Sequence, residues 1–259
     1  MTKHKIGVGI VGLQPGRSWA AVAHLPALRY LSEDYKVIGV ANSSLESGLA
    51  AAAECNIPRA FSSVQQMTEC EEVDVIAVTV KVPAHWEILK AAVRAGKHVY
   101  CEWPLGIDLA QAQALAQLAA DNGVKAVIGT QARVTPVMRQ LRELVAGGFV
   151  GDVLSTSVSG WGRIWGDTVE NLATDGYLLD KKNGATMLTI PFAHTLSALR
   201  DVLGDVVEVS AMLETRRKKV MAVEIGQSVD MDAPDQILVT GRLANGATLS
   251  MHYESPLVS

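Results

Sequence analysis

Residues 5–19 read KIGVGIVGLQPGRSW. The first part, Lys5–Val11, is a short apolar run of the kind that forms a buried parallel strand. A loop with glycines at positions 12 and 16 follows at once, and Trp19–Leu31 then has helical spacing. A strand, a glycine-containing loop and a helix in this order predict the entry of a dinucleotide-binding fold, because glycine permits the tight turn and the helix start presents free N–H groups to phosphate. The spacing departs from G-x-G-x-x-G, so an ordinary turn between strand and helix remains the alternative.

Short apolar runs continue to alternate with amphipathic ones up to residue 130. This alternation predicts a doubly wound parallel sheet with right-handed crossovers, a Rossmann-type α/β domain. The further strands are expected at Tyr35–Ala41, Ala60–Phe61, Val73–Val80, His98–Cys101 and Ala126–Thr130, and the helices at Leu45–Cys55, Ala84–Ala95 and Leu109–Asn122.

The pattern changes after residue 131. Helices are expected at Val134–Ala146 and Ala185–Leu203, and strands at Val153–Ser159, Val206–Leu213, Gln236–Leu243 and Ala247–Tyr253. The last two strands flank Asn245-Gly246, a strong hairpin signal. We therefore predict two domains, residues 1–131 for the dinucleotide and residues 132–259 for substrate and dimerisation. The second is an α+β domain with a mainly antiparallel open sheet.

Composition limits the classes of function. The chain has 259 residues, 49% of them hydrophobic, and a net charge of −4 without a basic block, so direct binding of nucleic acid is not expected. No apolar run is long enough to span a membrane. Three scattered cysteines fit reduced thiols in a cytoplasmic protein and offer no metal-ligand spacing, so no metal site is expected.

Three loops at the ends of the expected parallel strands supply the candidate cofactor site, since ligands bind outside the carboxyl ends of such strands. Apart from these loops, Asn42-Ser43-Ser44 follows the second strand, where an acidic residue would hold the ribose of NAD. The lack of an acidic residue here, with Arg17 as a counter-charge for a 2′-phosphate, favours NADP over NAD. In the alternative interpretation, Asn42 and the two serines cap the helix that follows. The candidate cofactor residues are Gly12, Leu13, Gly16, Arg17, Ser18, Trp19, Asn42, Ser43, Ser44, Thr79, Val80, Lys81, Pro83, His85, Glu102, Trp103 and Pro104.

Some of these candidates have plainer interpretations. His85 is more often a packed or capping residue, and Lys81 is as often a solvated loop lysine. Glu102 could contact the nicotinamide ribose and Trp103 could wall the substrate pocket, or the segment could be a turn with a packed indole.

The second domain carries the candidate catalytic groups. His194 lies in the helical segment that follows Gly184, and an imidazole is a credible acid or base for a hydroxyl, although a lone helical histidine is more often structural. If the two domains face each other, His194 would point into the cleft. Lys182 and Tyr177 are the further candidates. The polar, aromatic stretch around them suits a sugar, or is an exposed loop; it also includes Trp161, Arg163, Trp165 and Lys181.

Taken in order, several segments resemble the Gfo/Idh/MocA oxidoreductases: Gly9–Gly12, Ala23–Leu28, Val78–His85, Gly96–Val99, Glu102–Leu105 and Gly184–His194. Within that family the chain looks closest to the branch that contains the yeast galactose-pathway repressor, through Ser18-Trp19, Glu102-Trp103 and Ala185–Ile190. The resemblance implies an N-terminal cofactor domain and a C-terminal domain whose open sheet often forms a dimer face.

Two departures bear on activity. Trp103 stands where the family has the lysine of Glu-Lys-Pro, and Thr189 or Ile190 stands where the family has an acid, whereas His194 is kept. The leading hypothesis is an NAD(P)-dependent oxidoreductase acting on a sugar-like or related polyhydroxy or carbonyl compound, with His194, or else Lys182 or Tyr177, exchanging the proton. The rival hypothesis is a catalytically silent, dinucleotide-binding transcriptional regulator with a protein partner. A homo-oligomer, dimer or tetramer, is expected in either case. Family members run on beyond residue 259, so a shortened chain would leave the second sheet with an exposed edge.

Overall fold

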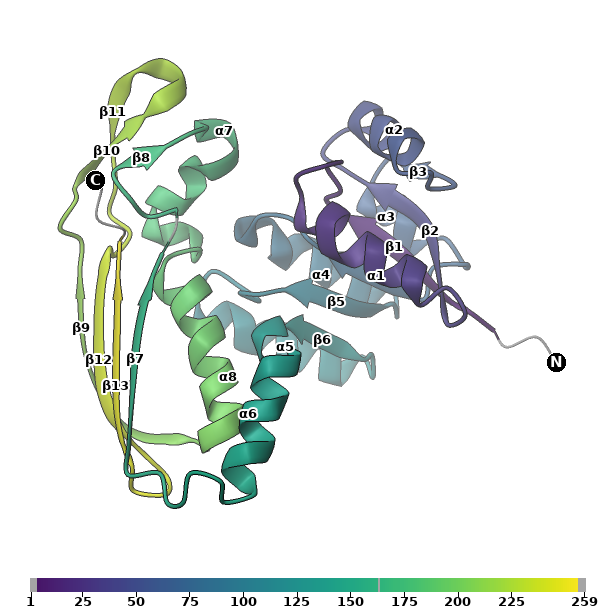
Figure 1. Cartoon of the computed structure of the whole chain (residues 1–259). Helices are drawn as coiled ribbons and strands as arrows, with labels where there is room; N and C mark the ends of the chain where they lie inside the picture. Colours follow the sequence, from purple (N-terminus) through teal and green to yellow (C-terminus); the bar gives the residue numbers. More distant parts are fainter. Residues whose placement is uncertain (1–3, 163, 256–259) are drawn as a thin grey trace. The chain divides into compact units, whose positions relative to one another are not determined.

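The computed structural model describes residues 4–162 and 164–255. The chain divides into two compact units, Met1–Gly129 and Thr130–Ser259 (Figure 1). The sequence predicts this boundary at residue 131. Among the described residues, no helix has the length and apolar character needed to cross a membrane.

The first unit contains one six-stranded sheet in the order β3-β2-β1-β4-β5-β6, and every neighbouring pair is parallel. This is the predicted Rossmann-type sheet. Apolar β-branched residues dominate its central strands because both faces are covered. The strands are β1 (Ile6–Val11), β2 (Tyr35–Ala41), β3 (Ala60–Phe61), β4 (Val75–Val78), β5 (His98–Glu102) and β6 (Ala126–Gly129).

Two clusters of buried side chains lie on opposite faces of this sheet. Two successive residues of β1 point to opposite faces. Ile10 packs with residues of α1 and α2, whereas Val11 packs with residues of α3, α4 and α5. The helices are η1 (Ala20–His24), α1 (Leu25–Tyr30), α2 (Leu45–Glu54), α3 (Val64–Thr68), η2 (Val82–Ala84), α4 (His85–Arg94) and α5 (Leu109–Asp121).

The first helix differs from the prediction. The spacing over Trp19–Leu31 predicts one continuous helix, but its first part, η1, is a π-helical turn. Pro26 occupies the first turn of α1 and has no N–H to continue an α-helical ladder, which accounts for a wider turn before it. The expected strand Val73–Val80 is shorter in the structure, because Val73 and Asp74 precede β4 and Thr79 and Val80 already belong to the loop after it.

The second unit has a four-stranded sheet in the order β7-β13-β12-β9 and a three-stranded sheet in the order β11-β10-β8. The β12–β13 hairpin pairs Arg242 with Thr248 around Gly246, whose φ of 91° suits glycine, as the Asn-Gly signal predicts. β7 pairs with β13 in parallel, so the sheet is mixed, mainly antiparallel. The strands are β7 (Ser155–Trp161), β8 (Thr168–Val169), β9 (Val206–Glu214), β10 (Lys219–Ala222), β11 (Gln227–Asp230), β12 (Gln236–Leu243) and β13 (Thr248–Glu254).

The helices α6 and α8 lie along one side of the four-stranded sheet (Figure 1). The sequence predicts both helices but not the three-stranded sheet, whose strands have only two to four residues each. The helices of this unit are η3 (Gln131–Val134), α6 (Pro136–Ala146), α7 (Leu172–Asp175), η4 (Gly176–Leu179), η5 (Lys181–Asn183), η6 (Leu188–Phe192), α8 (Ala193–Leu203) and η7 (Val223–Ile225).

Candidate functional site

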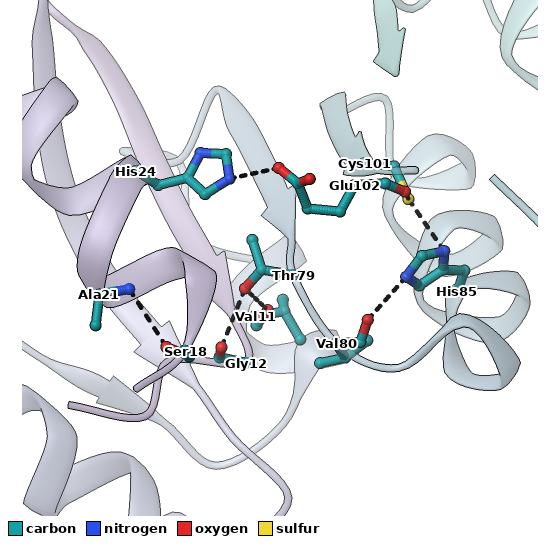
Figure 2. Close-up of polar contacts among 10 residues, drawn as sticks. All are labelled: Val11, Gly12, Ser18, Ala21, His24, Thr79, Val80, His85, Cys101 and Glu102. Carbon is teal, nitrogen blue, oxygen red and sulfur yellow. Dashed lines mark hydrogen bonds and ion pairs between the residues drawn. The ribbon is translucent and has the colours of Figure 1, made fainter. Parts of the chain in front are cut away.

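The candidate cofactor site lies where the strand order of the first unit reverses. β1 and β4 are neighbours in the sheet, and the connections that follow them run in opposite directions, from β1 to β2 and from β4 to β5. The loops after β1, β4 and β5 meet at the carboxyl edge beside this point (Figure 2). Open α/β sheets bind ligands at such an edge.

Gly12 begins the loop after β1, and no other residue type fits its position. Its φ is 95°, and a Cβ there would lie 2.5 Å from Cγ1 of Val80 and 3.2 Å from the carbonyl oxygen of Thr79. The backbone of the first loop therefore runs directly against the loop after β4. A backbone held this closely leaves room for a diphosphate at the helix start, which is the arrangement of dinucleotide-binding loops.

The loop is held from inside by three of its own residues. The Ser18 hydroxyl donates to the carbonyl of Gln14 at 2.9 Å and accepts from the N–H groups of Gln14 and Ala21. Leu13 is buried in the core with Leu25, so it anchors the loop and its side chain faces away from solvent. Its backbone N–H and carbonyl both bond to Asn42, so the direct cofactor contact expected from Leu13 stays a prediction.

Two backbone N–H groups are left for an anion. In the loop Gly12–Trp19, which the structure describes throughout, the amides of Gly16 and Trp19 have no hydrogen-bond partner. Gly16 has a φ of 72° and open space around it, and Trp19 directly precedes η1. Free amides at a helix start attract negative charge, so the residues present fit a diphosphate.

Asn42 connects the loop to the end of β2. Its Oδ1 accepts from the N–H of Leu13 at 2.9 Å, and its Nδ2 donates to the carbonyls of Leu13 and Ser47. Asn42 is thus occupied with holding the loop. Ser44 caps α2, since its Oγ accepts from the N–H of Ser47 at 3.1 Å, and this is the capping role that the sequence offered as an alternative.

Ser43 and Arg17 are exposed beside this edge. Neither side chain is hidden by packing, so both stay available to a ligand. Lys81 and Pro83, in the loop after β4, are exposed as well, and Val80 is half-buried against Gly12.

The loop after β4 is fixed to the first loop by Thr79. Its hydroxyl lies 2.9 Å from the carbonyl of Val11 and 3.0 Å from that of Gly12 (Figure 2). The Thr79 N–H also donates to Val11. Thr79 therefore aligns the two loops that would line the crevice.

His85 does not face that crevice. It is 1% exposed, and its ring lies between the carbonyl oxygens of Pro104, 2.9 Å from Nδ1, and Val80, 3.0 Å from Nε2. Burial lowers its pKa, while the hydrogen bonds to Val80 and Pro104 act in the opposite direction. His85 is expected from the sequence to contact the cofactor directly, but its buried ring instead links the loop after β4 to the loop after β5. The Cys101 thiol lies 3.3 Å from its Nδ1 (Figure 2).

Glu102 ends β5 and has partners that the sequence did not predict. Its Oε1 lies 2.6 Å from Nε2 of His24 in η1, and the Tyr100 hydroxyl bonds to the same carboxylate. Burial raises the pKa of Tyr100 to about 12, and the charge of Glu102 adds to this rise. Trp103 is half-buried, and a cis peptide bond joins it to the buried Pro104.

The catalytic candidates lie in the second unit. Tyr177 is in η4, Lys182 is exposed in η5, and His194 is half-buried in the first turn of α8. Burial raises the pKa of Tyr177, and the charge of Asp175 adds to this rise. Because a raised pKa favours the protonated phenol, Tyr177 suits proton acceptance poorly. His194 follows a second π-helical turn, η6, a feature that often marks functional sites.

Some side chains of the aromatic stretch expected to contact a sugar are buried in the structure, and others are exposed. Trp165 is buried, and its Nε1 donates to the carbonyl of Leu178 at 3.1 Å, so it belongs to the core of the unit. Trp161 is exposed at the end of β7 and Lys181 is exposed in η5. Arg163 lies outside the described residues. Thr189, one of the two residues that the resemblance offers for the position of the family's acid, accepts from the N–H of Thr186 and donates to the carbonyl of Gly184, which closes the turn before η6.

No group of histidine, cysteine and acidic residues that could hold a metal ion occurs in the part of the chain that the structure describes. His24 and Tyr100 are the residues that sequence reasoning missed. His24 is 78 positions away from Glu102, so no local spacing joins them. The one available signal was the place of His24 in the segment Ala23–Leu28, which matches the order of the family.

Two family models match the chain. Residues 6–130 match the oxidoreductase family GFO/IDH/MocA, NAD-binding Rossmann fold, and residues 136–258 match the C-terminal domain of Gal80p. The galactose/lactose metabolism regulatory protein GAL80 of Kluyveromyces lactis is 28% identical over 93% of this chain and 56% of its own length. The dehydrogenase aclE of Aspergillus oryzae is 34% identical over 78% of this chain and 56% of its own length. The chain thus spans little more than half the length of these relatives.

Solved structures show the same fold. The transcriptional regulator Gal80p from the same yeast superposes with a TM-score of 0.91 at 25% identity, over 98% of this chain and 65% of that one. Levoglucosan dehydrogenase, in complex with NADH and L-sorbose, superposes with a TM-score of 0.85 at 21% identity, over 97% of this chain and 67% of that one. The similar proteins therefore include both regulators and dehydrogenases.

Proposed function

The N-terminal half of this chain belongs to the GFO/IDH/MocA oxidoreductase family and the C-terminal half to the Gal80p-like C-terminal domains, and from this premise we propose that the protein binds a nicotinamide dinucleotide and oxidises or reduces a sugar-like or related polyhydroxy or carbonyl compound. The observation that carries the cofactor half of the proposal is the contact of Gly12 with the loop after β4. A side chain there would fill the space beside the diphosphate position.

Four residues of the first unit have direct roles in this proposal. The amides of Gly16 and Trp19 bind the diphosphate, and Glu102 accepts hydrogen bonds from the nicotinamide ribose. A bound nicotinamide would supply or accept the hydride. Trp103 walls the substrate side, since an indole offers an apolar face and one N–H donor.

The proton is exchanged by His194 in this proposal, with Lys182 and Tyr177 as weaker candidates. An imidazole is the commonest general acid or base in enzymes, whereas the raised pKa of Tyr177 keeps its phenol protonated. The lysine that the family uses for proton transfer is replaced by Trp103, so we expect slow turnover. Positioning of the reactants can still lower the barrier by several kcal/mol.

We also propose that the cofactor is NADP in preference to NAD. No acidic side chain follows β2, and the Asn42 amide is occupied by Leu13 and Ser47. A 2′-phosphate would thus meet no acidic side chain directly after β2, and Arg17 is exposed in the loop after β1. Levoglucosan dehydrogenase, which has the same fold, forms a complex with NADH, so the first experiment compares NADH with NADPH.

That experiment is calorimetry of the whole chain with NADPH and NADH, followed by a panel of sugars and polyols monitored at the absorbance band of reduced nicotinamide. We expect heat of binding and a rise in melting temperature with NADPH, and slow turnover of at least one polyol that His194→Ala abolishes. No heat and no change in melting temperature with either dinucleotide would end the proposal.

Two observations favour a second function, a catalytically silent transcriptional regulator. Trp103 replaces the family's lysine, and the matched C-terminal domain is that of Gal80p. A regulator needs the dinucleotide site but no proton carrier. Binding of NADPH or NADH without turnover across the whole panel, together with an unchanged affinity in His194→Ala, would favour this function over the enzyme.

A further inference from the structure

We propose that His24 is a positioning residue, which holds the Glu102 carboxylate in one orientation and ties it to the helix start that follows the diphosphate loop. The inference rests on the proposed dinucleotide site and assigns a residue beyond it. His24 would touch Glu102 and not the ligand itself.

The first support is the contact between the two side chains. Nε2 of His24 lies 2.6 Å from Oε1 of Glu102, and the side chains are 17% and 14% exposed (Figure 2). A carboxylate can only accept, so Nε2 carries the proton and donates it. A charge-assisted bond this short, largely shielded from water, is among the stronger polar contacts in proteins.

A second donor meets the same carboxylate. The Tyr100 hydroxyl bonds to Glu102, and the Tyr100 ring lies edge-on to the His24 imidazole, with centroids 5.1 Å apart at 72°. Two donors from different elements, one in η1 and one in β5, restrict the rotation of the Glu102 side chain. Its second oxygen keeps lone pairs for a ligand hydroxyl.

Gly129 makes space for this arrangement at the end of β6. A Cβ on Gly129 would lie 2.6 Å from the Tyr100 hydroxyl and 3.1 Å from both carboxylate oxygens of Glu102. Any larger residue would push the pair out of place. The four residues His24, Tyr100, Glu102 and Gly129 thus form one packed group.

The backbone of η1 explains how His24 reaches Glu102. His24 is the last residue of the π-helical turn Ala20–His24, which begins directly after Trp19 of the diphosphate loop. A π-turn carries one extra residue and so changes the direction of the side chains that follow it. Because the loop and His24 belong to the same continuous segment, the bond from His24 ties the carboxylate to the diphosphate amides.

The test separates positioning from a general loss of structure. Dissociation constants for NADH and for ADP are measured by calorimetry with the wild type, His24→Ala, His24→Gln, Glu102→Ala and the double variant His24→Ala/Glu102→Ala. ADP occupies the diphosphate amides but has no nicotinamide ribose for Glu102. His98→Ala is the matched control, since this half-buried histidine begins β5, at the opposite end of the strand from Glu102.

We expect His24→Ala to weaken NADH binding about tenfold, as loss of one hydrogen bond to a charged group implies, and to leave ADP binding unchanged. The amide of His24→Gln should restore part of the loss. The double variant should bind NADH as Glu102→Ala does, and His98→Ala as the wild type does.

Equal weakening of ADP and NADH in His24→Ala would show a structural role for η1 and overturn the inference. So would an unchanged NADH affinity, or additive losses in the double variant. If the wild type binds neither NADH nor NADPH, the proposed function fails, and the inference fails with it; if the wild type binds and His24→Ala binds equally well, the inference alone is wrong.

Discussion

At the scale of single residues, the candidate site depends on where side chains are absent as much as on where they are present. Gly12 and Gly129 both lie where a Cβ would meet atoms closer than 3.0 Å. The first lets two loops approach, and the second leaves room for Tyr100 and Glu102. At both positions, the atoms that exclude a side chain belong to residues that are distant in sequence.

Gly12→Ala should therefore abolish dinucleotide binding while the protein stays folded. The new methyl group would overlap Val80 and the backbone would be strained at a φ of 95°, costs that together correspond to a loss of affinity of about a hundredfold or more. Calorimetry with NADPH measures the loss. Gly96→Ala is the control, because its φ is 74° but nothing lies within 4 Å of the new methyl group; an equal loss in this control would assign the effect to instability.

Arg17→Ala should change the preference between the two dinucleotides. If the Arg17 guanidinium binds the 2′-phosphate, its removal should weaken NADPH binding about tenfold and leave NADH binding within about twofold. The ratio of the two dissociation constants is the measurement. An unchanged ratio would show that Arg17 does not select the cofactor, and the preference for NADP would lose its counter-charge.

At the scale of elements, one carboxylate joins three helical segments of the second unit. Asp201 in α8 bonds to Arg133 of η3 at 2.7 Å and to Arg142 of α6 at 2.9 Å. The hydrogen bond from Arg133 lowers the pKa of Asp201, and the charges of Arg133 and Arg142 add to this effect. These contacts hold α8, the helix that carries His194, against α6.

Asp201→Asn should lower the free energy of unfolding by up to about 1 kcal/mol at neutral pH, since the ion pairs of Asp201 with Arg133 and Arg142 are partly exposed. The pKa of Asp201 is lower in the folded protein than its ordinary value of 3.8, so its contribution is complete above that value and is lost as the pH falls through the folded pKa. Urea unfolding of the wild type and of Asp201→Asn at pH 7 and at pH 3 measures this contribution to stability. The two proteins should differ less at pH 3, and a difference that grows in acid would contradict the assignment.

At the scale of the whole molecule, the four-stranded sheet presents an open face. Leu238 and Met212 are paired across β12 and β9 and point to that face, where both are exposed. β9 is also an edge strand, exposed along nearly its whole length. Exposed apolar side chains on a sheet edge promote association. We propose that the protein forms a homo-oligomer through this sheet, as the family resemblance implies.

Met212→Lys should then shift the mass in light scattering from a dimer or tetramer towards the monomer, because a lysine in an apolar interface must lose its hydration. Val223→Lys is the matched control, since Val223 is similarly exposed but lies in η7 outside the sheet. A monomeric wild type, or an equal effect of both variants, would contradict an interface at the sheet.

The sequence by itself determined the order of the elements and the chemistry of the first loop. Apolar runs of strand length, helical spacing and the glycines at 12 and 16 are local signals, and they were sufficient to predict the Rossmann-type sheet, the second α+β unit and the Asn245-Gly246 hairpin. Short strands such as β8 and β10 carry too few residues for a period to show.

Only the tertiary structure decided what the polar side chains do. His85 is buried against the loops after β4 and β5, and Asn42 hydrogen-bonds to Leu13 and Ser47. Trp165 is buried in the core, and His24 hydrogen-bonds to Glu102. None of these outcomes follows from composition or spacing, because a hydrogen bond depends on a distance of about 3 Å between atoms that the chain can carry dozens of positions apart. Local periodicity determines which residues are buried, whereas the packing of the elements determines which polar groups meet.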